Sequence, residues 1–427
     1  MAMHNEVELL DFAKQKLLNG ASTIDSNPEG SRSRSLACLC VRFALEFNAD
    51  AISRDVACTQ VERHMRLCLS AMAGFERLFT IAGSEPLLAE AASQLTGGDL
   101  KKPVDHLADH FDLDCIDRGR RGELVATMIV MQARDDASAA QRSRWITVSG
   151  FMEALLPHDR FEEVLNSVPT LCDEDNDKPF GETFKDYAMW FNHVVRIKDP
   201  AMIKSEHLWT FITRGAMVVC TDNQDGVDIV LPLCPKTGNI SRDTVSAILI
   251  QVKNAKRYRR NIDNVLFNKM DPIELGIFEK NSPRRPIIRM VFALAAPDED
   301  DVDEDDVSVL PKEKRKKEQA KAVSSPGVRT RYSRRGDKNL TTTFDIWCAG
   351  LSEKTFNGNA NHVTPYKVLL NRLLQVDKVF TLREIKDDFL DEHTRRSRGS
   401  LRRRMAALTF SEDDHLRPHV QKKSNRE

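Results

Sequence analysis

One aspartate, one glutamine and one lysine in this chain have types and spacing that suit phosphodiester chemistry. Asp228 opens the apolar stretch DIVLPL, and Gln251 and Lys253 lie near the end of SAILIQVK, residues 246–253. Side chains two apart on a strand share a face, so Gln251 and Lys253 point the same way. Burying an amide and an ammonium group is unfavourable unless they are paired or reach water. We therefore expect this strand to end in a cleft that Asp228 lines from the neighbouring strand.

These residues would form a site for Mg²⁺ or Mn²⁺. Mg²⁺ takes hard oxygen ligands, often only one or two from the protein, and keeps several waters. The Asp228 carboxylate, the side-chain oxygen of Gln251 and the carbonyl of Val252 could supply such ligands. Lys253 could then orient or deprotonate a metal-bound water and stabilise the negative charge that builds at phosphorus. A plain cross-strand ion pair between Asp228 and Lys253, with no metal, is the alternative. Asp225 could replace Asp228 if the strand begins earlier.

The flanking sequence predicts the elements that would position this site. SEHLWTFITRG predicts a helix with Ser205 as its N-cap and Gly215 past its end. The runs AMVVC, DIVLPL and SAILIQVK then predict three strands, KRYRRNIDNVLFNKM a helix and RPIIRMVFALA a fourth strand. A charged segment at about 297–340 follows, and TTTFDIWCAGL predicts one more strand. We interpret the charged segment as a disordered insertion between two strands of one sheet.

The rest of the chain predicts a different organisation. Apolar residues recur at three- and four-residue spacing from about residue 6 to residue 192, which predicts helices. We expect an α+β protein with three parts. These are a mostly helical N-terminal region (1–195), a domain with an αβββαβ core around a central mixed sheet (196–375), and a helical, basic C-terminal tail (376–427).

The arrangement GVDIV, a spacer and ILIQVKN resembles the PD-(D/E)XK nuclease superfamily, whose core runs αβββαβ. Its Asp…QxK form is similar to Mrr-type restriction endonucleases, and SEHLWTFITRGAMVV followed by GVDIV resembles archaeal Holliday-junction resolvases. It is also similar to Crinkler-type nuclease domains of fungal proteins associated with mobile elements. The resemblance implies a restriction-endonuclease-like fold, Asp228 and Gln251 as metal ligands, and Lys253 as the catalytic lysine. It covers about 203–294, and it reaches 344–351 if the last strand is included.

Two further groups of residues bear on a nuclease activity. Such families often place an acid on the first helix, and Glu206 is the candidate here, although compensation of the helix dipole is its plain alternative. Basic residues directly after the glutamine strand could contact phosphates without reading bases, or could simply face solvent. They are Lys256, Arg257, Arg259 and Arg260. We expect DNA as the partner and leave RNA open. The same fold without turnover, as a module that binds nucleic acid or protein, is the alternative function, and a scaffold role for the helical region is the third.

Composition excludes several other classes. The formal net charge is -1, so a generally basic surface is ruled out and any nucleic-acid affinity must be local. The nine cysteines contain no CxxC pair, and the HxxxH pair His106 and His110 is more typical of a helix end than of a zinc site. The polar start and short apolar runs indicate an intracellular protein with no membrane partner. The cluster KEKRKK at 312–317 is typical of nuclear import or of a solvated linker.

Overall fold

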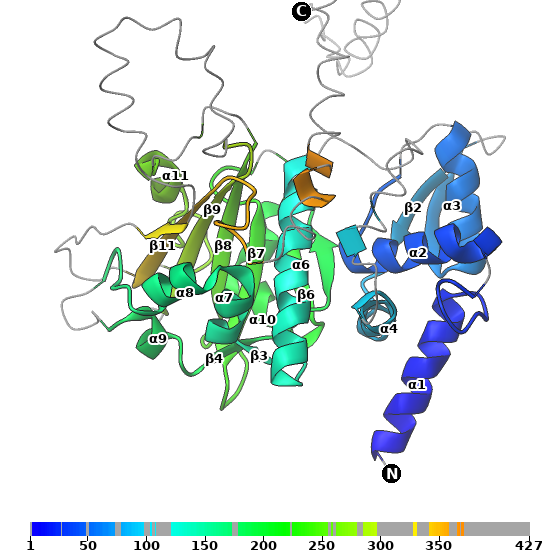
Figure 1. The fold of residues 1–427 in the computed structure, drawn as a ribbon, viewed down its shortest axis with the longest axis horizontal. Coiled ribbons are helices and arrows are strands. Elements are labelled where there is room, and N and C mark those ends of the chain that lie inside the picture. Colours follow the sequence, from blue (N-terminus) through cyan, green and yellow to red (C-terminus); the bar gives the residue numbers. More distant parts are fainter. Residues whose placement is uncertain are drawn as a thin grey trace, which may run out of the picture. The chain divides into compact units, whose positions relative to one another are not determined.

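A computed structural model of the chain contains a large mixed sheet, and the elements at its centre follow one another in the predicted order (Figure 1). The structure describes residues 2–26, 28–47, 51–72, 78–97, 103–104, 107, 121–172, 178–222, 224–254, 258, 262–279, 285–296, 328–330, 341–357, 365–367 and 369–370. The chain divides into two compact units, Met1–Leu373 and Leu374–Glu427, and the second lies outside the described residues. Everything below concerns the first unit.

The central elements follow one another as helix, three strands, helix and strand. They are α10 (Ser205–Thr213), β6 (Ala216–Val219), β7 (Ile229–Pro235), β8 (Ser246–Lys253), α11 (Asn264–Lys269) and β9 (Ile287–Ala293). The strands β6, β7 and β8 pair in antiparallel fashion, whereas β9 lies parallel to β8. The predicted α+β class, the αβββαβ order and the mixed sheet are thus confirmed.

The strand after the charged segment belongs to the same sheet. β11 (Thr343–Ala349) pairs in parallel with β9 along its full length, from Ile287↔Thr343 to Ala293↔Ala349. β10 (Val328–Thr330) adds an antiparallel strand beyond β11. The charged segment is therefore an insertion between two strands of one sheet, as expected, and apart from β10 its residues 297–340 lie outside the described part of the chain.

Apolar residues cover both faces of the central strands. On one face, Leu208, Phe211 and Ile212 of α10 and Leu266 and Phe267 of α11 pack against buried residues of β6 to β9. On the other face, α6 (Arg121–Gln141) packs against β8 (Figure 1). Near Gly122 the approach is so close that a Cβ atom there would lie 1.6 Å from Nδ2 of Asn254. Covering a strand on both faces explains why SAILIQV is almost uniformly apolar.

The region expected to be helical also contributes strands. Its helices are α1 (Ala2–Leu17), α2 (Pro28–Phe43), α3 (Ala51–Arg63), α4 (Pro86–Gly97), α6, α7 (Val148–Leu155), α8 (His158–Leu165) and the short α9 (Phe180–Thr183). A separate hairpin is formed by β1 (Arg66–Ala71) and β2 (Leu78–Ala82). β3 (Ile146–Thr147), β4 (Tyr187–Met189) and β5 (His193–Arg196) join the large sheet, with β4 on β7 and β5 on β6. The strands β3, β4 and β5 are two to four residues long, which is too short for period-2 alternation to predict them.

Helix α10 begins one residue earlier than the sequence predicted. Lys204 is its N-cap, not Ser205, and no side chain caps the helix. The Ser205 N–H instead donates to the Ile277 carbonyl at 2.9 Å, so a tertiary contact satisfies this orphan donor. Gly215 lies past the end with a φ of 63°, as predicted.

Candidate functional site

Asp228 lies directly before β7, next to the part of β8 that carries Gln251. The paired register of β7 and β8 ends at Ile229↔Ile250. Asp228 contacts the β8 residues on either side of Gln251, because its N–H donates to the Ile250 carbonyl and its Oδ2 accepts from the Val252 N–H. Asp228 and Gln251 thus begin a row of residues at this strand end. Cys220, which follows β6, continues the row, because its N–H donates to the Asp228 carbonyl at 2.9 Å.

Asp228 is held by one hydrogen bond to its backbone and one to its carboxylate. Its N–H donates to the Ile250 carbonyl at 2.9 Å, and the Val252 N–H donates to Oδ2 at 2.6 Å. Burial raises the pKa of the Asp228 carboxyl, and the Val252 hydrogen bond and the positive charge of Lys253 only partly oppose this shift. The ionised Asp228 carboxylate is thus held in place, but its buried negative charge is only partly compensated. A bound cation would compensate the rest.

In this row, Gln251 has a buried side-chain oxygen that accepts no hydrogen bond from the described residues. Its side chain is buried, with 3% of the residue exposed, and its Oε1 has no hydrogen-bond donor among the described residues. A buried polar atom left without a partner costs about 1–3 kcal/mol. A hard oxygen beside a buried carboxylate is what Mg²⁺ or Mn²⁺ selects, so these two side chains fit a divalent ion.

Lys253 lies at the end of the strand and is half-buried. Its Nζ lies 5.9 Å from the centroid of the Tyr258 ring. Burial raises the pKa of Asp228, and the positive charge of Lys253 opposes that shift only in part. The described ion pairs do not include one between Lys253 and Asp228. The plain cross-strand ion pair is therefore not the arrangement seen, and Lys253 stays available near the carboxylate.

Asp225 has a different role from the one that a longer strand would give it. Lys269 Nζ donates to both of its carboxylate oxygens at 2.9 Å, and this hydrogen bonding lowers the pKa of Asp225. Next to it, Gly226 has a φ of 86°, and a Cβ atom there would lie 2.2 Å from the Lys269 carbonyl oxygen. Asp225 thus serves a surface turn that docks on the end of α11.

Of the remaining predicted site residues that the structure describes, Glu206 is not brought to this row. Glu206 lies in the first turn of α10 with 53% of its side chain exposed, and its Oε1 lies 3.4 Å from His207 Nε2. Val252 contributes its N–H to Asp228, as described. Several predicted residues lie outside the described part of the chain: Lys256, Arg257, Arg259, Arg260, His106 and His110.

A second acid that the sequence argument passed over lies near the same strand end. Glu123, in the first turn of α6, has Oε2 4.0 Å from Nη1 of Arg196 on β5. Burial, then the charges of Asp228 and Glu123, raise the pKa of the Cys220 thiol well above 9. Arg196 pairs with Val219, so this group lies on the α6 face, opposite to Gln251. The only sequence signal was an acid in a first helical turn, which dipole compensation explains equally well.

A buried ion pair was also missed. Arg289 on β9 donates to both oxygens of Asp345 on β11, Nε at 2.6 Å and Nη2 at 2.8 Å, and its Nη1 donates to the Phe267 carbonyl at 3.0 Å. The two residues are register partners, and their side chains are almost wholly buried. A polar residue inside an apolar run, the signal used for Gln251, was present in both RPIIRMVFALA and TTTFDIWCAGL. This pair is fully hydrogen-bonded on its own and needs no ion.

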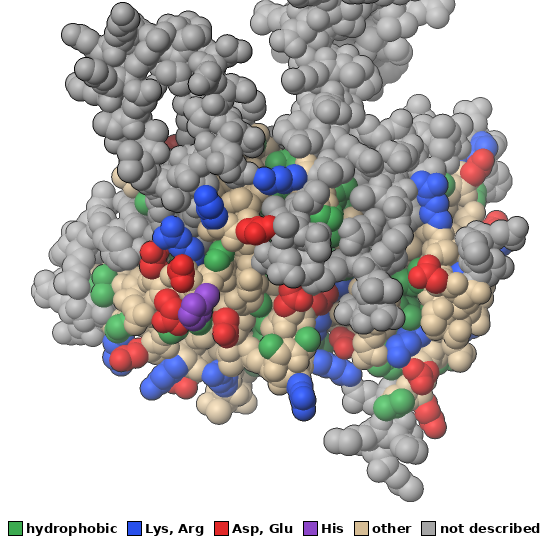
Figure 2. All heavy atoms as spheres, in the orientation of Figure 1, with side chains coloured by type: hydrophobic (Ala, Val, Ile, Leu, Met, Phe, Trp, Pro, Cys, Tyr) green, Lys and Arg blue, Asp and Glu red, His purple; other side chains and the backbone are tan. Residues whose placement is uncertain are grey.

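Two wider properties limit what the strand-end site can be. Within the described ranges, no three His, Cys, Asp or Glu side chains lie close enough to hold a metal, so an ion on Asp228 and Gln251 would depend on one charged ligand. On the face drawn in Figure 2, acidic side chains gather over α8, whose sequence HDRFEEVL supplies Asp159, Glu162 and Glu163. Phosphates would be repelled from that part of the surface.

Comparison with known proteins identifies the family but not an activity. A family model described as a domain of unknown function (DUF8736) matches residues 29–269, which is more than half of the chain. The chain therefore belongs to this family. No curated protein and no solved structure matches it. The match includes α2 to α11, with Asp228, Gln251 and Lys253, and ends before β9 and β11. Among the described helices, none has both the length and the apolar character needed to cross a bilayer.

Proposed function

We propose that this protein is a metal-dependent nuclease that hydrolyses DNA phosphodiester bonds at the Asp228–Gln251 row. The observation that supports it best is the buried, unpartnered Oε1 of Gln251 beside a buried carboxylate whose pKa is raised. Both groups gain from a divalent cation, and neither gains from the apolar side chains around it. The strand order around them agrees with the resemblance to PD-(D/E)XK nucleases.

Each residue has a distinct part in this chemistry. Asp228 and the Gln251 amide oxygen would hold Mg²⁺ or Mn²⁺, and the Val252 N–H keeps one carboxylate oxygen fixed in direction. Such an ion, when bound, lowers the pKa of water and polarises the phosphate. Lys253 stabilises the negative charge that develops on the phosphate oxygens, or holds the attacking water. Glu206 is half-exposed and paired with His207, so it is not assigned a part.

The direct test is cleavage of supercoiled plasmid with Mg²⁺ or Mn²⁺, with EDTA as the blank. Asp228→Asn and Lys253→Met should each lower the cleavage rate by about 100-fold or more, because each removes a charge that acts on the transition state. Asp225→Asn is the matched control. It removes an acid three residues away that pairs with Lys269, so the rate should not change.

Gln251→Glu gives the sharpest result. A carboxylate binds Mg²⁺ better than an amide, so this variant should cut at a lower metal concentration than the wild type. Cleavage that survives in Asp228→Asn and Lys253→Met would contradict the proposal. So would the absence of cleavage in both the wild type and Gln251→Glu at high Mn²⁺.

A binding module without turnover is the second candidate function. It is favoured by the single charged ligand in the described site, because one carboxylate and one amide hold Mg²⁺ weakly. In a gel-shift assay with duplex DNA, single-stranded DNA and RNA, this candidate predicts retention without metal and without cutting. The same assay decides between DNA and RNA as the partner, and retention of neither would leave a protein partner for the module.

A further inference from the structure

A shallow, open groove with several charged lining residues lies away from the strand-end site, between the end of α4 and the end of α6. Its volume is about 460 Å³. Its lining includes Glu90, Ser93 and Gln94 of α4, Arg134 and Asp135 of α6, and Arg142 and Arg144 just after α6. None of the strand-end residues takes part.

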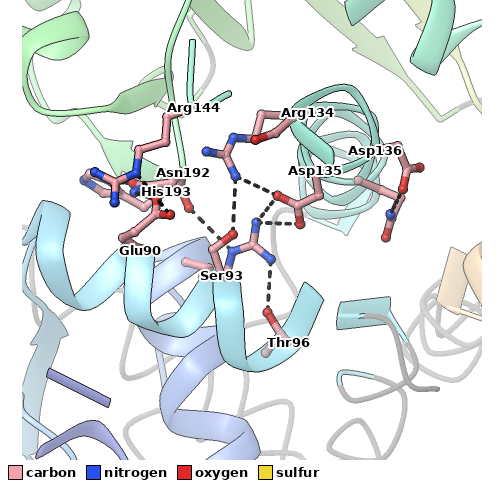
Figure 3. Close-up of polar contacts among 12 residues, drawn as sticks. Glu90, Ser93, Thr96, Arg134, Asp135, Asp136, Arg144, Asn192 and His193 are labelled. Atoms are coloured by element: carbon pink, nitrogen blue, oxygen red, sulfur yellow. Dashed lines mark hydrogen bonds and ion pairs between the residues drawn. The ribbon is translucent and has the colours of Figure 1, made fainter. Parts of the chain in front are cut away.

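One carboxylate at the groove, that of Asp135, is shared by two guanidinium groups, one of them behind the lining residues. Arg42 of α2 is fully buried, and its Nη2 donates to both oxygens of Asp135, at 2.8 and 2.9 Å. Arg134 must share the same carboxylate, with Nη1 3.0 Å from Oδ1 and 3.3 Å from Ser93 Oγ. One carboxylate therefore faces two guanidinium groups (Figure 3).

Arg134 is the less satisfied of these two guanidinium groups. Only 4% of its side chain is exposed, and its Nε and Nη2 have no acceptor among the described residues. Both nitrogens are shielded by their surroundings, so Arg134 acts on the groove mainly through its charge. The neighbouring Asp136 does not compensate it, because Asp136 lies on the other side of α6 (Figure 3) and lines a different cavity.

The rim adds two arginines on a rigid turn. Arg142 directly follows α6, with a left-handed φ of 49°, and is exposed. Ser138 Oγ donates to the Ser143 carbonyl at 2.7 Å, and the Trp145 N–H donates to Ser143 Oγ at 3.1 Å, which fixes the turn. Arg144 has 45% of its side chain exposed and lies 3.6 Å from Glu90, at the mouth of the groove.

The lining residues leave a net charge of about +1 at neutral pH, because Arg134, Arg142 and Arg144 outnumber Glu90 and Asp135 by one. Behind the lining, the buried Arg42 adds one further positive charge next to Asp135. Guanidinium groups match phosphate oxygens in geometry as well as charge. We propose that this groove binds the phosphate group of a small phosphate monoester, with Arg142 and Arg144 in direct contact and with Arg134 and Arg42 supplying charge from beneath. Glu90, Ser93 and Gln94 would then accept or donate hydrogen bonds to hydroxyl groups of the same ligand.

The test is isothermal titration calorimetry of the full chain in the presence of EDTA. The ligands are inorganic phosphate and AMP, with adenosine as the uncharged probe. The wild type should bind phosphate and AMP but not adenosine. The double variant Arg142→Gln/Arg144→Gln should weaken AMP binding at least tenfold. Both residues are exposed, so folding should be unaffected, which its thermal melt would check. Arg242→Gln, an exposed arginine in the β7–β8 connection, is the control and should bind like the wild type.

The outcomes separate this site from the proposed nuclease site. Asp228→Asn should keep the wild-type affinity for AMP, because Asp228 does not line the groove. Loss of AMP binding in Asp228→Asn, equal binding in Arg142→Gln/Arg144→Gln and the wild type, or no phosphate binding by the wild type would each overturn the proposal. A failure of DNA cleavage would not affect it.

Discussion

Gln251 and Arg289 are both buried polar side chains in apolar strands, but their surroundings differ. Arg289 has a bidentate carboxylate and a carbonyl as partners, so each nitrogen of its guanidinium group has an acceptor within the fold. The Oε1 of Gln251 has no donor in the described part of the chain. Residues of the first kind are explained by the fold, whereas residues of the second kind indicate a ligand.

At the same scale, the raised pKa of Asp228 makes a prediction about stability. The folded protein binds this proton more tightly than the unfolded chain does, so the stability contributed by Asp228 falls as pH rises through its raised pKa. Asp228→Asn keeps an acceptor for the Val252 N–H and removes the buried charge. We therefore expect a higher free energy of unfolding than the wild type at neutral pH, with the difference vanishing below about pH 3.8.

Urea unfolding at several pH values would measure this difference, and Mg²⁺ would add a second readout. The ion should stabilise the wild type and leave Asp228→Asn unchanged. Asp225→Asn is the control, and it should lower the free energy of unfolding at neutral pH, because the hydrogen bond from Lys269 lowers the pKa of Asp225. An Asp228→Asn variant that is less stable than the wild type at neutral pH would show that the carboxylate is a structural anchor.

At the scale of elements, the Arg289–Asp345 pair joins two parallel strands, and its two residues lie 56 positions apart in the chain. Asp345→Ala should lower the free energy of unfolding by about 3–5 kcal/mol, since it leaves a buried guanidinium unpaired. The double variant Arg289→Met/Asp345→Leu should be neutral, or stabilising by up to about 4 kcal/mol, because apolar residues can replace a buried pair.

Urea unfolding of Arg289→Met, Asp345→Leu and the double variant Arg289→Met/Asp345→Leu forms a thermodynamic cycle that measures this coupling. If the double variant loses as much stability as the two single variants added together, the pair is not coupled and its role in joining β9 to β11 is wrong. Arg160→Ala, which removes an exposed pair with Glu163 on α8, is the control and should change stability by less than about 1 kcal/mol.

Elements were predictable from the sequence where they are long and uniformly apolar. β8, β9 and β11 were found for this reason, as was the insertion that separates the last two. The proximity of Asp228 to the strand of Gln251 could be anticipated because two strands joined by a short connection usually pair. The capping of α10 by Lys204, the strands β3 to β5 and the partner of Arg289 depend on residues distant in the chain, which periodicity does not report.

At the scale of the whole molecule, the first unit depends on its C-terminal strands. A chain that ends at Lys269, the end of the family match, would lack β9 and β11 and so expose the buried edge of β8. We expect that truncation to be insoluble or to lack a cooperative unfolding transition. A chain that ends at Leu373 retains the whole unit and should unfold with the midpoint of the full chain.

Soluble yield and thermal melts by circular dichroism would compare the two truncations with the full chain. Cooperative unfolding of 1–269 at the same midpoint would show that β9 and β11 are dispensable for the fold. A lowered midpoint for 1–373 would show that Leu374–Glu427 stabilises the first unit.

The position of β11 also sets an order of events during synthesis. β9 ends at Ala293 and its parallel neighbour begins at Thr343, with 49 residues between them. At typical translation rates of about 5–20 residues per second, the β9 edge waits about 2–10 s for its partner. The segment that is made in this interval is dense in alternating blocks of acidic and basic residues, such as DEDDVDEDD and KEKRKK. Such charge blocks oppose edge-to-edge association of nascent chains, so the insertion would protect the unfinished sheet while the ribosome completes it.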